Sequence, residues 1–293
     1  MKQIGTLIPD IYSLLKRKDG WFNDELAQSF STSLAKRLQL QFSPRKEGTL
    51  RLSKMGPQCP RALWYSVHKP ELAEPMPAWA ENKFSFGHMV EAWAITLAKA
   101  AGHSVEGEQD ELVVDGVVGH RDCVLDGYTV DIKSCSSRMF KRFEDKSIAK
   151  NDTFGYLDQL DGYTVGSTND PLVRYLDKAY ILAVDKTLGH MCLYEHEVRH
   201  DPIRSRIGLY KGYIKQESPP PCTCRTIEFG RSGNRCLDVK ASYSPYKHHC
   251  FPTLRTFIYS DGPVYLTKVE RVPDVPELSR RGSSEPARKG FIN

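Results

Sequence analysis

Apolar and polar positions follow their most regular pattern between Glu111 and Ser134, where short β-rich runs are separated by two Asp-Gly pairs. An Asp-Gly pair between two such runs is a strong signal for a two-residue hairpin turn. The pairs at 115–116 and 126–127 therefore predict a three-stranded meander over this segment.

The second turn also predicts which residues face one another. If the chain turns at 126–127, Leu125 pairs with Tyr128, and counting back sets Asp122 opposite Asp131. Directly opposed residues share one face of a sheet, with Cβ atoms about 5 Å apart. Lys133 lies two residues after Asp131 and points to that same face.

Two opposed carboxylates would normally destabilise a hairpin, because like charges repel. A divalent cation between Asp122 and Asp131 would reverse that cost, since hard cations bind carboxylate oxygens at about 2.0–2.6 Å. His120 is expected opposite Lys133 on this face, where it can contact a phosphate. The alternative is a solvated hairpin face with scattered charges, and the neighbouring elements decide between the two interpretations.

A helical period predicts a helix from Lys83 to Ala101, ended by Gly102. Glu91 falls at the edge of its apolar stripe, so that its carboxylate can lie over the buried side and still reach a cleft. His88 lies on the other side of the helix and is expected to be structural or exposed. The stripe consists of Phe86, Met89, Val90, Trp93 and Leu97.

A basic loop that contains Arg142 precedes a further predicted helix, which Asp152 or Thr153 can cap. Gln159 and Tyr163 are four residues apart on this helix and therefore share one face. The remaining pattern divides the chain into a helical N-terminal region (1–82), an α/β core (83–216), a cysteine-bearing C-terminal segment with a hairpin (217–272) and a loose tail (273–293).

Composition is that of an ordinary globular protein, with 40% hydrophobic and 26% charged residues. The sequence has no apolar run of about 18 residues, so no membrane span is expected. The N-terminus has charges where a signal peptide needs an apolar core, which favours a cytoplasmic protein. Eight cysteines in such a protein indicate thiols or metal ligands rather than a disulfide scaffold.

The net charge of +5 permits binding to nucleic acid without requiring it. Basic residues gather between Lys36 and Arg61, where Glu47 is the one acid. This run is either a solvated surface or a strip that faces phosphates, and a neighbouring nuclease site would favour the strip. Its members are Lys36, Arg37, Arg45, Lys46, Arg51, Lys54 and Arg61.

The order of these pieces resembles the PD-(D/E)XK nuclease superfamily, and within it the RecB-like exonucleases of bacteriophage type. The pieces are a helical Glu91, Asp122 in Gly-x-x-Asp, the Asp131-x-Lys133 pair and Gln159-x-x-x-Tyr163. The phrases YSPYKHHCFP and YSDGPVYLTKV add to the resemblance, which covers about 50–272. It implies a restriction-endonuclease-like α/β fold, with a mixed central sheet flanked by helices and with helical N-terminal and cysteine-bearing C-terminal extensions.

The resemblance also implies roles for the matched residues. Glu91, Asp122 and Asp131 would hold Mg²⁺ or Mn²⁺, with the backbone carbonyl of Ile132 as a further ligand. Lys133 would position or deprotonate the attacking water. The substrate-binding residues would be Gln159 and Tyr163 near the scissile phosphate, with His120 and Arg142 contributing further phosphate contacts.

The cysteines depart from the family pattern. Many relatives carry a four-iron four-sulfur cluster held by one early cysteine and a late Cys-x2-Cys-x5-Cys. Cys59 and Cys250 fit the first and last places, but Ala241 and Ser244 occupy the two middle places. The iron–sulfur pattern is therefore degenerate, and we expect the cluster to be absent and the protein to be colourless.

Zinc is the alternative for the late cysteines, although their spacing matches no common zinc motif and free thiols remain the simpler expectation. The candidate zinc ligands are Cys222, Cys224, Cys236 and His248 or His249.

These features predict a metal-dependent DNA exonuclease of phage type, used in recombination, replication or DNA degradation. Its partners would be DNA and phage or host replication and recombination proteins. A structure-specific endonuclease or junction resolvase is the nearest alternative among enzymes. A non-catalytic DNA-binding module is the alternative from another class, and the complete set of two acids and a lysine argues against it.

Overall fold

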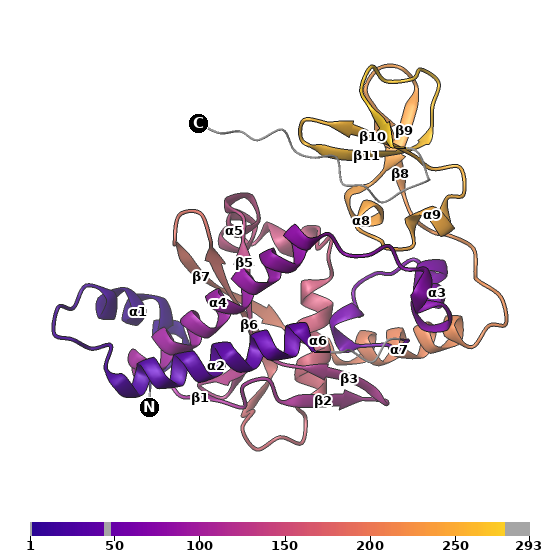
Figure 1. The fold of residues 1–293 in the computed structure, drawn as a ribbon. Coiled ribbons are helices and arrows are strands. Elements are labelled where there is room, and N and C mark those ends of the chain that lie inside the picture. Colours follow the sequence, from indigo (N-terminus) through magenta and orange to yellow (C-terminus); the bar gives the residue numbers. More distant parts are fainter. Residues whose placement is uncertain (1, 44–47, 279–293) are drawn as a thin grey trace. The chain divides into compact units, whose positions relative to one another are not determined.

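The structure, a computed structural model, describes residues 2–43 and 48–278. The chain forms two compact units, Met1–Pro220 and Pro221–Asn293 (Figure 1). Among the described residues, no helix is long and apolar enough to cross a membrane.

A five-stranded sheet forms the centre of the first unit, in the order β1-β4-β5-β6-β7. β5 and β6 run parallel, whereas the other neighbouring strands are antiparallel. The sheet is therefore mixed, as predicted. Its strands are β1 (Val105–Glu106), β4 (Cys123–Leu125), β5 (Tyr128–Cys135), β6 (Tyr175–Asp185) and β7 (Met191–Glu197).

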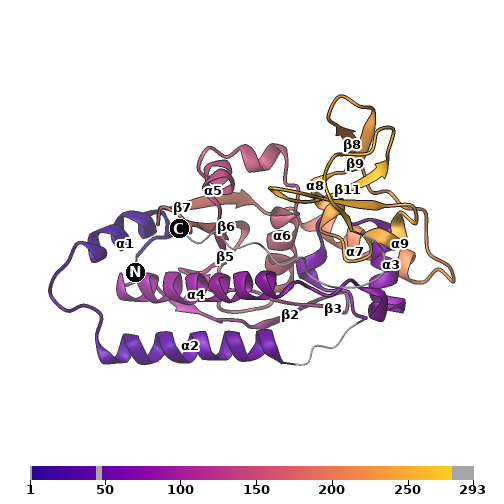
Figure 2. The same ribbon diagram turned by 45° about the horizontal axis from the view of Figure 1, so that its top comes forward.

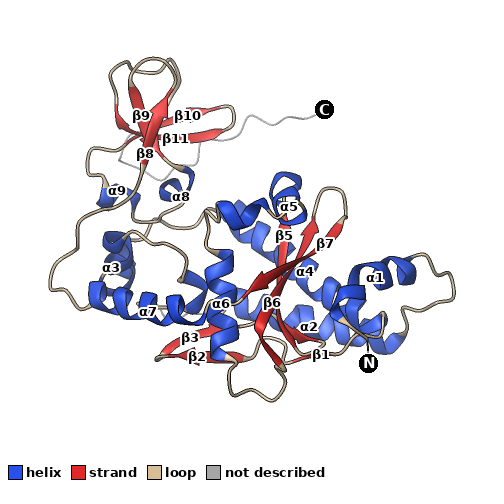
Figure 3. Ribbon diagram, turned by 180° about the vertical axis from the view of Figure 1, so that it is seen from behind, coloured by secondary structure: helices blue, strands red, loops and turns tan. Residues whose placement is uncertain are grey.

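Helices cover both faces of this sheet, which confirms the predicted layered α/β architecture (Figure 3). On one face, α1 (Leu7–Leu15) and α4 (Ala78–Ala100) pack against apolar side chains such as Val130 and Ile132 of β5. On the other, α5 (Ser137–Glu144) and α6 (Tyr156–Gly166) pack against alternate residues of β6, such as Ile181. The alternation follows from the two-residue period of a strand.

The remaining helices of the first unit extend this core. The helix α2 lies beside α4 (Figure 2), and α3 packs on α7. These helices are α2 (Asp24–Phe42), α3 (Pro60–His68) and α7 (His200–Ile214), with short 3-10 turns η1 (Ile4–Thr6), η2 (Leu52–Lys54), η3 (Pro70–Leu72) and η4 (Ser147–Lys150).

The predicted three-stranded meander is wrong. The strands β2 (Glu111–Val114) and β3 (Val117–His120) form a separate two-stranded sheet, and β4 joins the central sheet instead. Arg121 lies between β3 and β4, and its fully buried guanidinium forms ion pairs with Asp110 and Asp170. At this buried residue the chain passes from the two-stranded sheet of β2 and β3 into the central sheet.

Most of the apolar stripe expected on α4 does not face the core. Leu97 is buried in the core as expected, but Phe86 is 55% exposed and Met89 is 44% exposed. Beside Leu97, the buried face of α4 includes the small residues Ala94 and Ala98, which allow the helix to approach α1 and the sheet closely.

The second unit contains an antiparallel sheet in the order β12-β10-β11-β9-β8. The predicted C-terminal hairpin is β10–β11, in which Tyr259 pairs with Gly262. Part of the expected tail forms β12, and residues 279–293 lie outside the described residues. The elements are β8 (Thr226–Phe229), β9 (Asn234–Leu237), α8 (Val239–Ser242), α9 (Lys247–Cys250), β10 (Arg255–Tyr259), β11 (Gly262–Lys268) and β12 (Glu277–Leu278).

Candidate active site

The hairpin of β4 and β5 brings the two predicted aspartates together. Its register pairs Leu125 with Tyr128, as predicted. The turn residues Asp126 and Gly127 both have positive φ, at 51° and 89°. A two-residue hairpin turn of type I′ requires positive φ at both positions. One residue beyond the paired ladder, Asp122 Oδ2 accepts a hydrogen bond of 2.6 Å from the backbone N–H of Ile132.

Asp131 is the most deeply buried of the predicted catalytic residues, with 1% of its surface exposed. Lys133 Nζ lies 2.8 Å from Asp131 Oδ2, so the two predicted neighbours form an ion pair. Within the described part of the chain, neither oxygen of Asp131 accepts a hydrogen bond of good geometry. Lys133 offsets part of the cost of burying this carboxylate, and a ligand that supplies further positive charge would lower the remaining cost.

Glu91 reaches the aspartates from α4. Its Oε1 accepts hydrogen bonds from Arg37 Nε at 2.8 Å and from Gln109 Nε2 at 2.7 Å. Its Oε2 lies 3.6 Å from Nδ1 of His88, which therefore contacts the site. The amide of Gln109 also lies 3.5 Å from Asp122 Oδ1, so it connects the two carboxylates.

The clustered charges shift the pKa values of the acids. Burial and the negative charges of Glu91 and Asp131 hold the pKa of Asp122 well above its ordinary value. Burial also raises the pKa of Asp131, against the opposing charge of Lys133. Burial alone would raise the pKa of Glu91, but hydrogen bonding to His88 and the charge of Arg37 outweigh it, and the pKa is lowered.

Burial acts on Lys133 in the opposite sense, because it disfavours the ammonium ion. The charges of Asp131 and Asp122 more than offset burial and raise the pKa of Lys133 above its ordinary value. The ammonium therefore keeps its charge when no metal is bound, and its charge suits it to positioning a reacting group rather than to removing a proton.

The helix α6 brings the predicted Gln159 and Tyr163 to Lys133. Gln159 Oε1 accepts from Lys133 Nζ at 3.4 Å, and Gln159 Nε2 donates to the hydroxyl of Tyr163 at 2.7 Å. The ring of Tyr156 lies 5.2 Å from the same ammonium, within range of a cation–π contact.

Contacts of the buried Asp161 fix the orientation of α6. Asp161 Oδ1 lies in hydrogen-bond contact with His196 Nε2 at 2.6 Å, and Asp161 Oδ2 pairs with the Arg199 guanidinium at 2.6 Å. At its N-terminus, Gly155 has a φ of +76° and approaches Gly56 so closely that a Cβ on Gly155 would stand 2.2 Å from the Gly56 Cα. Glycine at both positions allows the segment before α3 to lie against the start of α6.

Two predicted substrate-binding residues lie away from this cluster. His120 does not face Lys133: it pairs with Glu111 in the two-stranded sheet, and its side chain is 47% exposed. The error follows from the incorrect meander, because β3 belongs to another sheet. Arg142 on α5 donates to the backbone carbonyl of Asn151, and no described contact joins it to the carboxylates.

The site includes residues that the sequence did not identify. Arg37 was expected in a basic strip, yet it is buried against Glu91 and Glu108. Arg45 and Lys46 of that strip lie outside the described residues. Gln109 has a left-handed φ of 58°. No short motif marks either Arg37 or Gln109, because both reach the site through tertiary contacts from α2 and the loop before β2.

A cavity of about 380 Å³ lies beside this cluster, between α2 and the loop before β2. Arg37 and Gln109 line it together with Lys36, Ser33 and Glu108. The two residues that bind Glu91 therefore also border open space, and a ligand in the cavity would lie next to the carboxylates.

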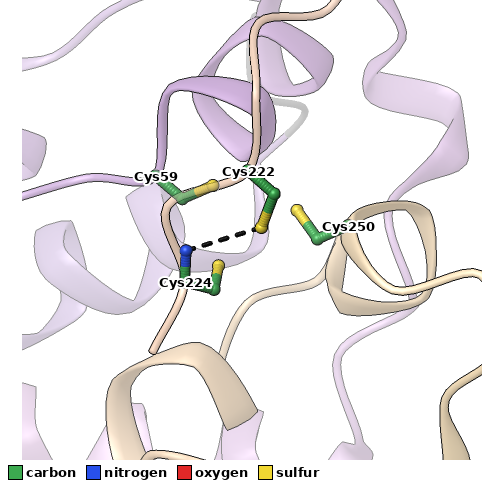
Figure 4. Close-up of side chains that lie close together, drawn as sticks. All are labelled: Cys59, Cys222, Cys224 and Cys250. Carbon is green, nitrogen blue, oxygen red and sulfur yellow. Dashed lines mark hydrogen bonds between the residues drawn. The ribbon is translucent and has the colours of Figure 1, made fainter. Parts of the chain in front are cut away.

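Three cysteines of the second unit also lie together (Figure 4, where Cys59 of the first unit is drawn as well). The sulfur atoms of Cys222, Cys224 and Cys250 are within 4.8 Å of one another. From the sequence, only Cys250 matches the late family pattern, and Cys236 is expected to group with Cys222 and Cys224. Cys236 is instead a buried residue of β9 and is not part of this group.

The arrangement of Glu91, Asp122, Asp131 and Lys133 can bind a divalent cation beside a fixed positive charge. Hard cations take carboxylate oxygens, and such an ion next to an ammonium can stabilise charge that develops on a phosphoryl group. The set fits this chemistry, because Asp131 offers two oxygens without hydrogen bonds from the described residues.

Comparisons with known proteins give distant structural likenesses. Neither a protein-family model nor a curated protein matches the sequence. A phage-related exonuclease from Haemophilus somnus 129PT is 15% identical with a TM-score of 0.38, over 58% of this chain and 94% of that chain. The alkaline exonuclease LHK-Exo from Laribacter hongkongensis is 12% identical with a TM-score of 0.37, over 64% and 90%.

The LHK-Exo complex with dAMP gives a TM-score of 0.36 at 12% identity, over 63% of this chain and 94% of that chain. Likenesses this weak do not establish a shared fold, and the chemistry of the site follows from its own geometry.

Proposed function

We propose that this chain is a metal-dependent deoxyribonuclease with Glu91, Asp122, Asp131 and Lys133 as its catalytic residues. One observation carries the proposal: Asp131 is buried beside Asp122 and Glu91, and its one ion-pair partner is Lys133, with no hydrogen bond of good geometry from the described residues. A divalent cation would add positive charge beside these acids and bind their carboxylate oxygens.

In this proposal Asp122 and Asp131 are the main ligands of Mg²⁺ or Mn²⁺, with the carbonyl of Ile132 as a further ligand. Glu91 would contribute Oε2, because its Oε1 already accepts from Arg37 and Gln109. When bound, such an ion polarises a phosphoryl oxygen and lowers the pKa of a bound water molecule.

The protein's own groups hold the substrate in this account. Lys133 positions the attacking water, since its ammonium remains charged beside Asp131. Gln159 and Tyr163 contact the DNA strand near the scissile phosphate, which their hydrogen bonding to each other and to Lys133 supports. Arg142 adds a more distant phosphate contact, and its effect is expected to depend strongly on salt concentration.

The finer part of the proposal is that the enzyme is an exonuclease of bacteriophage type that acts on DNA in recombination, replication or degradation. It rests on the resemblance of the ordered motifs from Glu91 to Tyr163. The partners would then be DNA and the phage or host proteins that produce or use its ends.

Digestion of linear and covalently closed circular DNA tests the proposal. With Mg²⁺ or Mn²⁺, we expect the end-labelled linear duplex to be degraded from an end and the closed circle to remain intact, with no cleavage in a chelator. Cleavage of the closed circle would replace the exonuclease with an endonuclease. DNA binding without cleavage in either metal would support a non-catalytic binding module and contradict the proposed activity.

A further inference from the structure

The group formed by Cys222, Cys224 and Cys250 has the donor atoms of a metal site. Cys222 and Cys224 lie on the segment that leads into β8, and Cys250 is the last residue of α9. Their sulfur atoms are within 4.8 Å of one another. Cys250 is buried, and the other two are half-buried, so the group is shielded from solvent without being closed.

A backbone contact supports the group (Figure 4). The N–H of Cys224 points to the Cys222 sulfur, with a donor–acceptor distance of 3.4 Å. Such a contact orients the Cys222 sulfur by placing the N–H dipole beside it. Hydrogen bonds to the ligand atoms are a regular feature of protein metal sites, where they orient the ligands and tune their basicity.

The spacing of the sulfur atoms distinguishes a single ion from a cluster. Four thiolates around one zinc ion, each at about 2.3 Å in a tetrahedron, lie about 3.8 Å apart. In a four-iron cluster each thiolate binds a different iron at the outside of the cube, so its thiolates stand farther apart. Separations within 4.8 Å therefore favour one tetrahedral ion.

We infer that Cys222, Cys224 and Cys250, all of the second unit, bind a single structural zinc ion. Thiolates suit zinc, which binds cysteine ligands in tetrahedral geometry. The ligand set differs from the late cysteine pattern of the related nucleases, because Cys222-x-Cys224 supplies the thiolates that Ala241 and Ser244 lack.

The second unit has a reason to need such an ion, because its apolar core is small. One cluster is built around buried Cys236, Phe257 and Leu266, and a second around Leu237, Ala241 and Leu254. Units below about 70–80 residues rarely obtain enough stability from a single core and often add a metal. Zinc would tie the start of the unit at Cys222 to α9.

Metal analysis of the full-length protein tests the inference independently of any nuclease activity. We expect about one zinc per chain and no stoichiometric iron or sulfide, including after anaerobic purification. When zinc is replaced by Co²⁺, the protein should show thiolate-to-cobalt charge-transfer bands and the visible bands of a tetrahedral site. Cys222→Ser, Cys224→Ser and Cys250→Ser should each weaken zinc binding at least tenfold.

Cys236→Ser is the matched control, because Cys236 is a buried cysteine of the same unit outside the group, and this variant should retain the zinc. Should a ligand variant fail to fold, Co²⁺ titration of the metal-free wild-type protein still gives the answer. Stoichiometric iron with a brown chromophore, a disulfide within the group in place of metal, or wild-type protein that binds neither ion would overturn the inference.

Discussion

At the residue scale, the site is defined by three clustered carboxylates, of which Glu91 and Asp131 are buried and Asp122 is half-buried. Asp122 and Glu91 share the amide of Gln109, and Asp131 has one ion-pair partner in Lys133. Three acids therefore meet with fewer positive groups nearby than their charges require. The raised pKa of Asp122 is the electrostatic sign of that imbalance.

Asp122→Asn should make the metal-free protein more stable at neutral pH. Burial raises the pKa of Asp122 in the folded chain, so above the ordinary carboxyl value of about 3.9 the folded state binds more protons than the unfolded state. The free energy of unfolding therefore falls as pH rises through this window. Asparagine carries no charge, and its Oδ1 can still accept from Ile132.

Thermal unfolding in a chelator at several pH values measures this effect. The advantage of Asp122→Asn should be present at pH 7 and vanish below the ordinary carboxyl pKa, where the wild-type side chain is neutral in both states. Added Mg²⁺ should stabilise the wild-type protein more than the variant. A wild-type protein that is the more stable one at pH 7 in chelator would argue against this electrostatic account.

Lys133→Ala should retain metal binding but hydrolyse DNA slowly. The metal ligands remain, whereas the positive group beside Asp131 is lost, and removal of such a group costs about 10²-fold or more in turnover. Lys178→Ala is the control, since Lys178 lies on the neighbouring strand β6 in an exposed pair with Glu195. Equal turnover of both variants would make Lys133 a charge-balancing residue only.

At the scale of elements, the site joins a hairpin, three helices and a loop. The hairpin of β4 and β5 supplies the aspartates, α4 supplies Glu91, and α6 supplies Gln159 and Tyr163. The helix α2 contributes Arg37, which fastens it to α4 through Glu91. The side chains reach fixed positions because the elements that carry them are packed or ion-paired.

Arg37→Ala should destabilise the protein by about 3–5 kcal/mol, because it leaves Glu91 as a buried charge without its partner. The same change in a Glu91→Gln background should cost much less, since no charge is then left uncompensated. Chemical denaturation of both single variants and the double variant measures the coupling. Lys36→Ala, at the exposed neighbouring position on α2, should behave like the wild type. Additive effects of Arg37→Ala and Glu91→Gln would contradict the pairing.

Gln159→Ala and Tyr163→Phe should weaken DNA binding or turnover and leave metal affinity unchanged. Each variant removes a polar group from the hydrogen-bonded pair beside Lys133, whereas the carboxylates are untouched. DNA binding measured in Ca²⁺ and calorimetry of metal binding separate the two effects. Wild-type behaviour of both variants would mean that the Gln-x-x-x-Tyr match on α6 is accidental.

At the scale of the whole molecule, local signals predicted what depends on neighbours in the sequence. The turn at Asp126-Gly127 fixed the pairing of Leu125 with Tyr128, because two positive φ values allow few alternatives. The mixed sheet flanked by helices was expected from the resemblance of the ordered motifs and not from the local pattern. The Gln159–Tyr163 pair was predictable because four residues make about one helical turn.

Contacts between distant segments could not be predicted in the same way. Arg121 lies where the chain passes between two sheets, and it pairs with Asp170, which is distant in the sequence. His120, one residue earlier, therefore stays in the two-stranded sheet and not at the site. Arg37 reaches Glu91 across 54 residues of sequence. On α4, Leu97 is buried as predicted, but tertiary packing buries Ala94 and Ala98 beside it and leaves Phe86 exposed.

Cleavage of a labelled linear duplex by wild-type and Asp131→Asn proteins over a range of Mg²⁺ concentrations tests the central claim most directly. Asparagine keeps the size of the side chain but loses the charge and one acceptor oxygen. We predict metal-dependent cleavage by the wild type, a loss of about 10³-fold in the variant, and DNA binding close to wild type. Full activity of Asp131→Asn, or wild-type cleavage that persists in a chelator, would contradict the account.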